Sequence, residues 1–247
     1  MKETESEDQD DVTLFSVTDI TNPIVVCGGV VCIFMFLSSW ANHSSQNVSE
    51  NRYLVDNFNE DLSSSWRGRY DDYNSIYTIE STDDNSYLSA NSIQTDNFII
   101  KAIDVDLVEY PYLNWRWRAH TLPVEGDESI KAKCDVAASI AVVLNKSRII
   151  PKSIKYSWST SLTQDSLTKS PFAFWPSRCD IRVMQSGSEE SGIWVHEKVN
   201  VLEDYKLFYN KNRVKSKTAN AIVILTDSDN TKSLSKADYD DIYFSKK

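Results

Sequence analysis

The sequence predicts an all-β protein, an antiparallel β-sandwich of jelly-roll type with one packed helix, over residues 52–247. Short runs of β-branched and aromatic residues recur along this stretch, and clusters of Asn, Asp, Ser and Gly separate them. This spacing is typical of stacked sheets. Several runs also alternate apolar and polar residues with a period of two, which gives a strand one buried and one exposed face.

The clearest predicted strand spans residues 112–120, where apolar and polar side chains alternate. The apolar members are Leu113, Trp115, Trp117 and Ala119, and the polar members are Asn114, Arg116, Arg118 and His120. The same alternation predicts strands at 153–158 and 180–183, whereas continuous apolar runs at 137–144 and 219–225 predict central strands covered on both faces. Further strands are expected at 53–58, 76–80, 87–90, 98–103, 192–199 and 242–244.

One helix is expected at 202–211, because apolar residues recur there at helical spacing and form a stripe that can pack against a sheet. The stripe consists of Leu202, Tyr205, Phe208 and Tyr209.

The first fifty residues divide into three predicted segments. Residues 1–22 carry seven acids against Lys2 and are expected to be a disordered acidic tail. Residues 23–41 contain no charged residue, which predicts a transmembrane anchor or a signal segment, although a signal segment normally has a basic start. The Ser- and Asn-rich residues 42–51 are expected to be a flexible tether. The expected location is the cell envelope, with the domain membrane-anchored or secreted into the periplasm.

Charge argues against nucleic acid as a partner. The formal net charge is −10, and most of it comes from the acidic tail. The mildly acidic remainder offers no basic face to neutralise phosphates, which supply most non-specific nucleic-acid affinity. No nucleotide-binding loop, nucleophile elbow or zinc signature occurs either.

Two of the four cysteines fall in the predicted domain. Cys27 and Cys32 lie in the apolar segment, which leaves Cys134 and Cys179 as a candidate disulfide. Outside the cytoplasm two such thiols pair if their Cβ atoms meet. The alternative is that both are unpaired buried thiols.

Four acids near the C-terminus form a candidate metal site. They are Asp227, Asp229, Asp240 and Asp241. If the strands that carry them are neighbours, their oxygens suit Ca²⁺, which takes six to eight oxygen ligands. The alternative is that they shape turns by accepting bonds from nearby backbone N–H groups.

The polar face of strand 112–120 is a candidate ligand-binding surface. Arg116 and Arg118 point the same way, and Asp135, Lys155 and Tyr156 are expected to join them from neighbouring strands. Planar guanidiniums suit an anionic or polyhydroxyl ligand. The alternative is that internal carboxylates neutralise them. Tryptophans, among them Trp194, offer stacking surfaces for sugar rings or belong to the core.

Several segments resemble the bacterial domain-of-unknown-function family 3047. The similarity runs over most of residues 53–247, and its most specific marks are WRWR at 115–118 and TDSDNT at 226–231 followed by ADYDDI at 237–242. The resemblance implies an exported sandwich domain similar to galactose-binding-like and jelly-roll modules. It supplies no catalytic residue.

Three functions therefore stay open. The leading expectation is a non-catalytic, membrane-tethered module that binds a carbohydrate-like ligand of the cell envelope. The alternative is a structural or assembly protein of the envelope that binds a partner protein. The third is a glycan-active enzyme using paired carboxylates such as Asp227 and Asp241.

Overall fold

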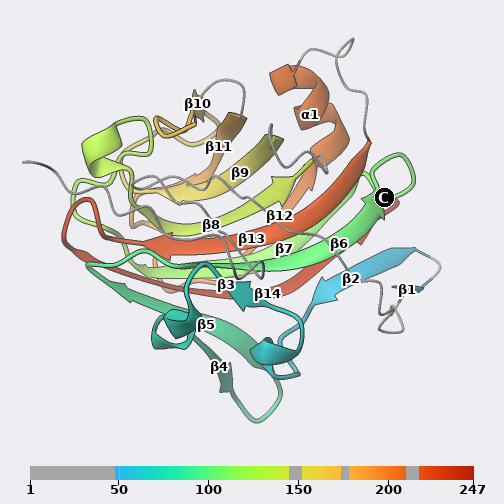
Figure 1. Cartoon of the computed structure of the whole chain (residues 1–247), viewed down its shortest axis with the longest axis horizontal. Helices are drawn as coiled ribbons and strands as arrows, with labels where there is room; N and C mark the ends of the chain where they lie inside the picture. Colours follow the sequence, from blue (N-terminus) through green and yellow to red (C-terminus); the bar gives the residue numbers. More distant parts are fainter. Residues whose placement is uncertain (1–47, 50, 145–151, 174–177, 210–216) are drawn as a thin grey trace, which may run out of the picture.

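The structure, a computed structural model, describes residues 48–49, 51–144, 152–173, 178–209 and 217–247 (Figure 1). The predicted tail 1–22 and apolar segment 23–41 lie outside these residues, as does most of the tether 42–51. The strand β1 (Val48–Ser49) falls within that tether and pairs with β2, so the folded part begins by Val48. Within the described residues no helix has the length and apolar character to cross a membrane.

Two seven-stranded sheets form a sandwich and confirm the predicted fold class. We call them sheet A and sheet B. Sheet A contains β1, β2 (Arg52–Asp56), β4 (Tyr77–Ser81), β5 (Ser86–Ile93), β7 (Tyr112–Thr121), β12 (Val195–Asn200) and β14 (Leu234–Ser245). Sheet B runs in the order β10 (Leu167–Lys169), β11 (Arg178–Ser186), β9 (Lys152–Ser159), β8 (Val136–Val143), β13 (Thr218–Asp227), β6 (Phe98–Asp106) and β3 (Arg67–Gly68).

The pairing of the described strands is antiparallel with one exception. β11 pairs with β9 in parallel, with Arg178 opposite Lys152 and Ser186 opposite Ser159. β14 is the long central strand of sheet A, where it pairs with β7 on one side and with β5 and then β2 on the other. The change of partner coincides with a bulge, at which Asp241 adopts a positive φ of 50°.

The alternation of β7 puts its tryptophans into the core between the sheets. Trp115 and Trp117 are fully buried, and their rings lie 5.6 and 6.1 Å, centroid to centroid, from Tyr156 and Trp158 of β9. The predicted central strands are β8 and β13, which are buried along nearly their whole length. The predicted alternation therefore orients both sheets correctly.

The predicted helix is α1 (Val201–Tyr209), which follows β12 directly. Tyr205 and Tyr209 are buried and stack edge to face at 5.2 Å, and the Tyr209 hydroxyl donates to the carbonyl oxygens of Ser153 and Arg178 in sheet B. The described chain also contains three short 3₁₀ turns, namely η1 (Leu62–Ser64), η2 (Asp71–Ser75) and η3 (Lys131–Lys133). Figure 1 shows α1 and β4 toward opposite edges of the molecule.

Candidate functional site

The predicted arginine face exists, but carboxylates of β14 occupy it. Arg116 contacts Asp240 at 2.5 Å through Nη2 and Asp241 at 2.9 Å through Nε. Nε of Arg118 lies 2.7 Å from Asp238, whose Oδ2 is also 2.7 Å from His120 Nε2. The guanidiniums thus neutralise carboxylates within the protein. Of the two alternatives that the sequence left open, these contacts favour neutralisation by internal carboxylates over guanidiniums that await a ligand.

An aromatic pair covers these arginines on the outer face of sheet A. The guanidinium carbons of Arg116 and Arg118 lie 4.9 and 4.6 Å from the ring centroid of Trp194. Tyr87 of β5 meets Trp194 edge to face at 5.7 Å. Cation–π contacts of this kind stabilise both partners. The two arginines therefore pack against an aromatic layer in addition to pairing with the neighbouring carboxylates.

The other three predicted ligand-binding residues lie in or beside sheet B and do not join the arginines. Tyr156 is fully buried in the core and donates a hydrogen bond to Asp204 of α1. Lys155, the neighbour of Tyr156 in β9, belongs to the opposite face of that strand and is also buried. Asp135 precedes β8 and accepts bonds from the turn after β13. The alternation of side chains along a strand determines which side chains share a face of that strand. It does not determine to which of the two sheets the strand belongs.

Lys155 lies in a buried group of ionisable side chains. Burial lowers its pKa, but Asp227, Cys134 and Glu128 outweigh that effect, and the net pKa is raised. The ammonium form is therefore kept in the interior. The position is enclosed, which does not suit a surface ligand.

The predicted metal site divides between the two sheets. Asp240 and Asp241 pair with Arg116 in sheet A, whereas Asp227 and Asp229 meet Asp135 at the end of sheet B. One oxygen from each of these last three lies within 4.8 Å of the others.

The chemistry of this triad favours the turn interpretation over Ca²⁺. Both oxygens of Asp135 already accept bonds, from Asn230 N and from Thr231 N and Oγ1. Oδ1 of Asp227 accepts from Val136 N. Burial, with repulsion from Asp135, raises the pKa of Asp227 well above its usual range. Few oxygen lone pairs remain for a cation that wants six to eight ligands.

The pair of carboxylates considered for glycan hydrolysis does not share a site. Asp227 ends β13 of sheet B, and Asp241 lies at the bulge of β14 in sheet A. The predicted cysteine pair is not bridged either. Cys134 and Cys179 are free thiols, and the Cys134 Sγ donates to the Glu128 carbonyl oxygen. Burial raises the pKa of both thiols.

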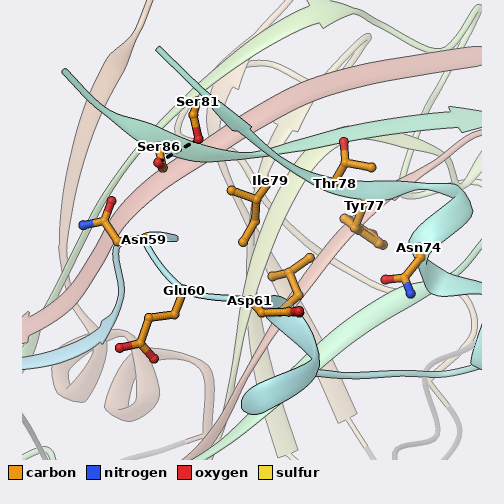
Figure 2. Close-up of a pocket in the computed structure, with 10 residues that line it drawn as sticks. Asn59, Glu60, Asp61, Asn74, Tyr77, Thr78, Ile79, Ser81 and Ser86 are labelled. Atoms are coloured by element: carbon orange, nitrogen blue, oxygen red, sulfur yellow. Dashed lines mark hydrogen bonds between the residues drawn. The ribbon is translucent and has the colours of Figure 1, made fainter. Parts of the chain in front are cut away.

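A pocket at the edge of sheet A was not predicted. We call it the β4 pocket; it has a volume of about 450 Å³ and lies between β4 and the loop after β2. Its lining residues come from these two segments, from η1, from η2 and from the start of β5; they are Asn59, Glu60, Asp61, Leu62, Asn74, Tyr77, Thr78, Ile79, Ser81 and Ser86. In Figure 2 Ile79 points from β4 toward the loop that carries Asn59 and Asp61.

Asp56 at the end of β2 fixes the loop that forms one wall of this pocket. Its carboxylate accepts bonds from Phe58 N at 2.7 Å, Trp66 Nε1 at 2.9 Å and Lys101 Nζ at 2.7 Å. Phe58, at a positive φ of 53°, stacks on Trp66 with centroids 6.1 Å apart. The wall is therefore held by one half-buried carboxylate and an aromatic pair.

The lining combines an apolar floor with many hydrogen-bonding groups. Leu62, Tyr77 and Ile79 supply the floor. Hydroxyls, amides and carboxylates surround it, and two of the hydroxyls, those of Ser81 and Ser86, bond to each other at 3.0 Å (Figure 2). Polar residues of the loop 57–61 gave no periodic signal, so sequence patterns did not reveal this arrangement. The strand predicted at 53–58 ran into this loop, whereas β2 ends at Asp56.

Two stacked sheets, a packed helix and a pocket at one edge define a sandwich domain of the jelly-roll class. Within that class the chain belongs to the family DUF3047, described as a protein of unknown function, whose model matches residues 65–243. This confirms the resemblance seen in the WRWR and TDSDNT segments. A comparison with curated proteins gives no match.

Solved structures with a similar course of the chain include carbohydrate-binding modules and glycoside hydrolases. The family 11 carbohydrate-binding module of the Clostridium thermocellum cellulase Lic26A-Cel5E is 9% identical, with 80% of this chain and 95% of the module covered and a TM-score of 0.40. A family 12 xyloglucanase from Bacillus licheniformis is 10% identical, with 80% and 97% covered and a TM-score of 0.40. Values this low transfer neither a ligand nor a catalytic residue to this chain.

Proposed function

We propose that this protein is a non-catalytic module that binds a carbohydrate-like, polyhydroxyl ligand in the β4 pocket. The observation that carries the proposal is the lining itself, which places amides, hydroxyls and carboxylates around an apolar floor. Sugars present hydroxyl edges and apolar C–H faces together, and pockets that bind small molecules combine the same two kinds of surface. The pocket also suits an oligosaccharide in size, since ligand sites commonly measure roughly 300–1,000 Å³.

The Asp61 carboxylate of the pocket suits a role in binding rather than that of the general acid in hydrolysis. A glycosidase needs a general acid whose pKa is raised so that it holds a proton near neutral pH. The pKa of Asp61 is instead lowered, because the backbone N–H of Ser63 donates to its carboxylate at 2.8 Å. The carboxyls with strongly or clearly raised pKa, Asp227 and Asp229 among them, are not residues that line the pocket.

We propose further that residues 23–41 tether the domain to the cell envelope, outside the cytoplasm. The support is the uncharged stretch, which has the length of a bilayer span. Fractionation of cells, with protease added to intact cells or spheroplasts, tests this location. Recovery of the full-length chain in the cytosol would count against the tether and would leave the binding proposal in place.

Calorimetric titration with a panel of neutral and charged oligosaccharides tests the binding role. The double variant Asn59→Ala/Asn74→Ala removes two amides of the pocket, and Asn91→Ala removes an exposed amide of β5 that does not line it. One net hydrogen bond is worth about 1 kcal/mol, so we expect the double variant to bind about 10-fold more weakly or worse. The control should bind as the parent does. A panel without any binder, or equal affinity of the double variant, would refute the proposal.

A further inference from the structure

The charged residues known to line the β4 pocket are of one sign. Glu60 and Asp61 are both exposed carboxylates, and no Lys or Arg is among the described residues of the lining. The described part of the chain holds no ion pair of Glu60, and in Figure 2 its carboxylate points away from β4. This exposed carboxylate is therefore available to a ligand that extends from the pocket toward it.

The chain around the pocket adds to the same charge. Residues 56–84 contain eight acids and only two basic residues, Arg67 and Arg69. Both arginines are engaged elsewhere. Arg69 pairs with Asp96, and Arg67 donates to the carbonyl oxygens of Ser63 and Trp66. Asp56 is itself paired with Lys101, and the other seven acids still leave this stretch of the chain with an excess of negative charge.

We infer that the ligand of the β4 pocket carries positive charge, as an oligosaccharide with free amino groups does, because Glu60 and Asp61 are the charged side chains among the described residues of its lining. This inference rests on the proposed saccharide-binding function and narrows its ligand class. Hydroxyls, amides and the apolar floor bind the sugar body, and the two carboxylates bind ammonium groups.

Physical chemistry favours this ligand over its neutral and anionic counterparts. A hydrogen bond between an ammonium group and a carboxylate is roughly twice as strong as one between neutral groups. A cleft with charge of one sign also concentrates ligands of the opposite sign and repels uronic acids or phosphorylated sugars. The lowered pKa of Asp61 keeps its carboxylate ionised at mildly acidic pH, where sugar amines are protonated.

Two sugars of equal length make a sharp comparison. β-1,4-linked glucosamine pentaose and cellopentaose differ only at C2, which bears an amine in the first and a hydroxyl in the second. Titrated into the full chain at pH 5.5 and low salt, the amino sugar should bind about fivefold more tightly, the value of two partly screened ion pairs. Raising the salt to about 0.3 M should reduce that advantage, since exposed ion pairs are screened.

The variant Glu60→Gln/Asp61→Asn removes both charges and keeps a side-chain oxygen at each position, so the new amide at position 61 still accepts the bond from Ser63 N. It should bind the two sugars equally well. The control Glu189→Gln/Glu190→Gln removes two exposed carboxylates from a turn that does not line the pocket, and should keep the parent's preference for the amino sugar.

The outcomes test the charge of the ligand separately from the proposed saccharide binding. Equal binding of both sugars by the parent, or a preference that survives Glu60→Gln/Asp61→Asn, would overturn the charge inference and leave a saccharide-binding pocket. Failure of both sugars and of the wider oligosaccharide panel would overturn the inference together with the proposed function.

Discussion

Replacing Arg116 by Ala separates its structural role from any role in ligand binding. The variant leaves the Asp240 carboxylate, whose side chain is only 1% exposed, with Asn85 Nδ2 and Asp241 N as its partners. Removing one member of a buried ion pair costs about 3–5 kcal/mol. Because the Arg116 side chain is 24% exposed, we expect the lower end, a loss of about 3 kcal/mol in the free energy of unfolding.

Urea denaturation of parent and variant measures this loss. The double variant Arg116→Ala/Asp240→Asn should recover part of it, because the uncompensated charge is gone. Lys206→Ala is a matched control that removes one partner of the exposed pair with Glu203 and should cost less than about 0.5 kcal/mol. Saccharide affinity of the Arg116→Ala variant should match the parent, since Arg116 is not among the residues that line the β4 pocket. A loss below about 1 kcal/mol, or a loss of binding in the folded variant, would refute this reasoning.

Three further predictions concern other side chains. Burial and repulsion from nearby acids raise the pKa of Asp229 above 3.8. The native state therefore holds this proton more tightly than the unfolded chain does. As a result, the free energy of unfolding falls as the pH rises from the pKa of the unfolded state to that of the native state. Asp229→Asn should therefore raise the free energy of unfolding by up to about 1 kcal/mol at pH 7 and change it little at pH 3. Urea denaturation at both pH values measures the difference. A variant that is less stable than the parent at pH 7 would contradict this. Burial raises the pKa of the Cys134 thiol to about 12. Iodoacetamide at pH 8 should therefore label this thiol far more slowly in the native protein than in the unfolded protein, and mass spectrometry measures both rates. Equal labelling rates would be inconsistent with the burial of Cys134. Asp56→Ala removes the hydrogen-bond acceptor of Trp66 and Lys101. It should lower the free energy of unfolding, measured in urea, by about 2–3 kcal/mol and expose the loop 57–62 to protease. An unchanged midpoint of urea denaturation would argue against Asp56 as the anchor of the pocket wall.

The fold was predictable where side-chain pattern alone decides the structure. Alternation in 112–120 correctly placed Trp115 and Trp117 in the core, and the helical spacing from Leu202 correctly indicated α1. The parallel pairing of β9 with β11 was not predictable, because alternation states which face is buried and says nothing about strand direction. β14 was also predicted too short, as residues 242–244, because the residues before them include the charged Lys236, Asp238, Asp240 and Asp241.

The β4 pocket escaped prediction for a related reason. Its wall is a loop that Asp56 shapes through Trp66, which follows the loop closely in sequence, and through Lys101, which lies far from it. Loop conformation depends on such tertiary contacts, whereas sequence patterns report only local preference. A polar lining assembled from four segments therefore leaves no signature in any one of them.

The arginine face could have been predicted correctly if one strand pairing had been known. β7 pairs with β14 in a register that sets Arg116 opposite Asp240 and Arg118 opposite Asp238. Opposite residues of an antiparallel pair point to the same face, so this one pairing turns two apparently free guanidiniums into two cross-strand ion pairs. It also removes Asp240 from the predicted metal site, since the strand that carries it lies in sheet A and Asp227 ends a strand of sheet B. The candidate sites thus depended on which strands are neighbours, a property that period-two patterning leaves open.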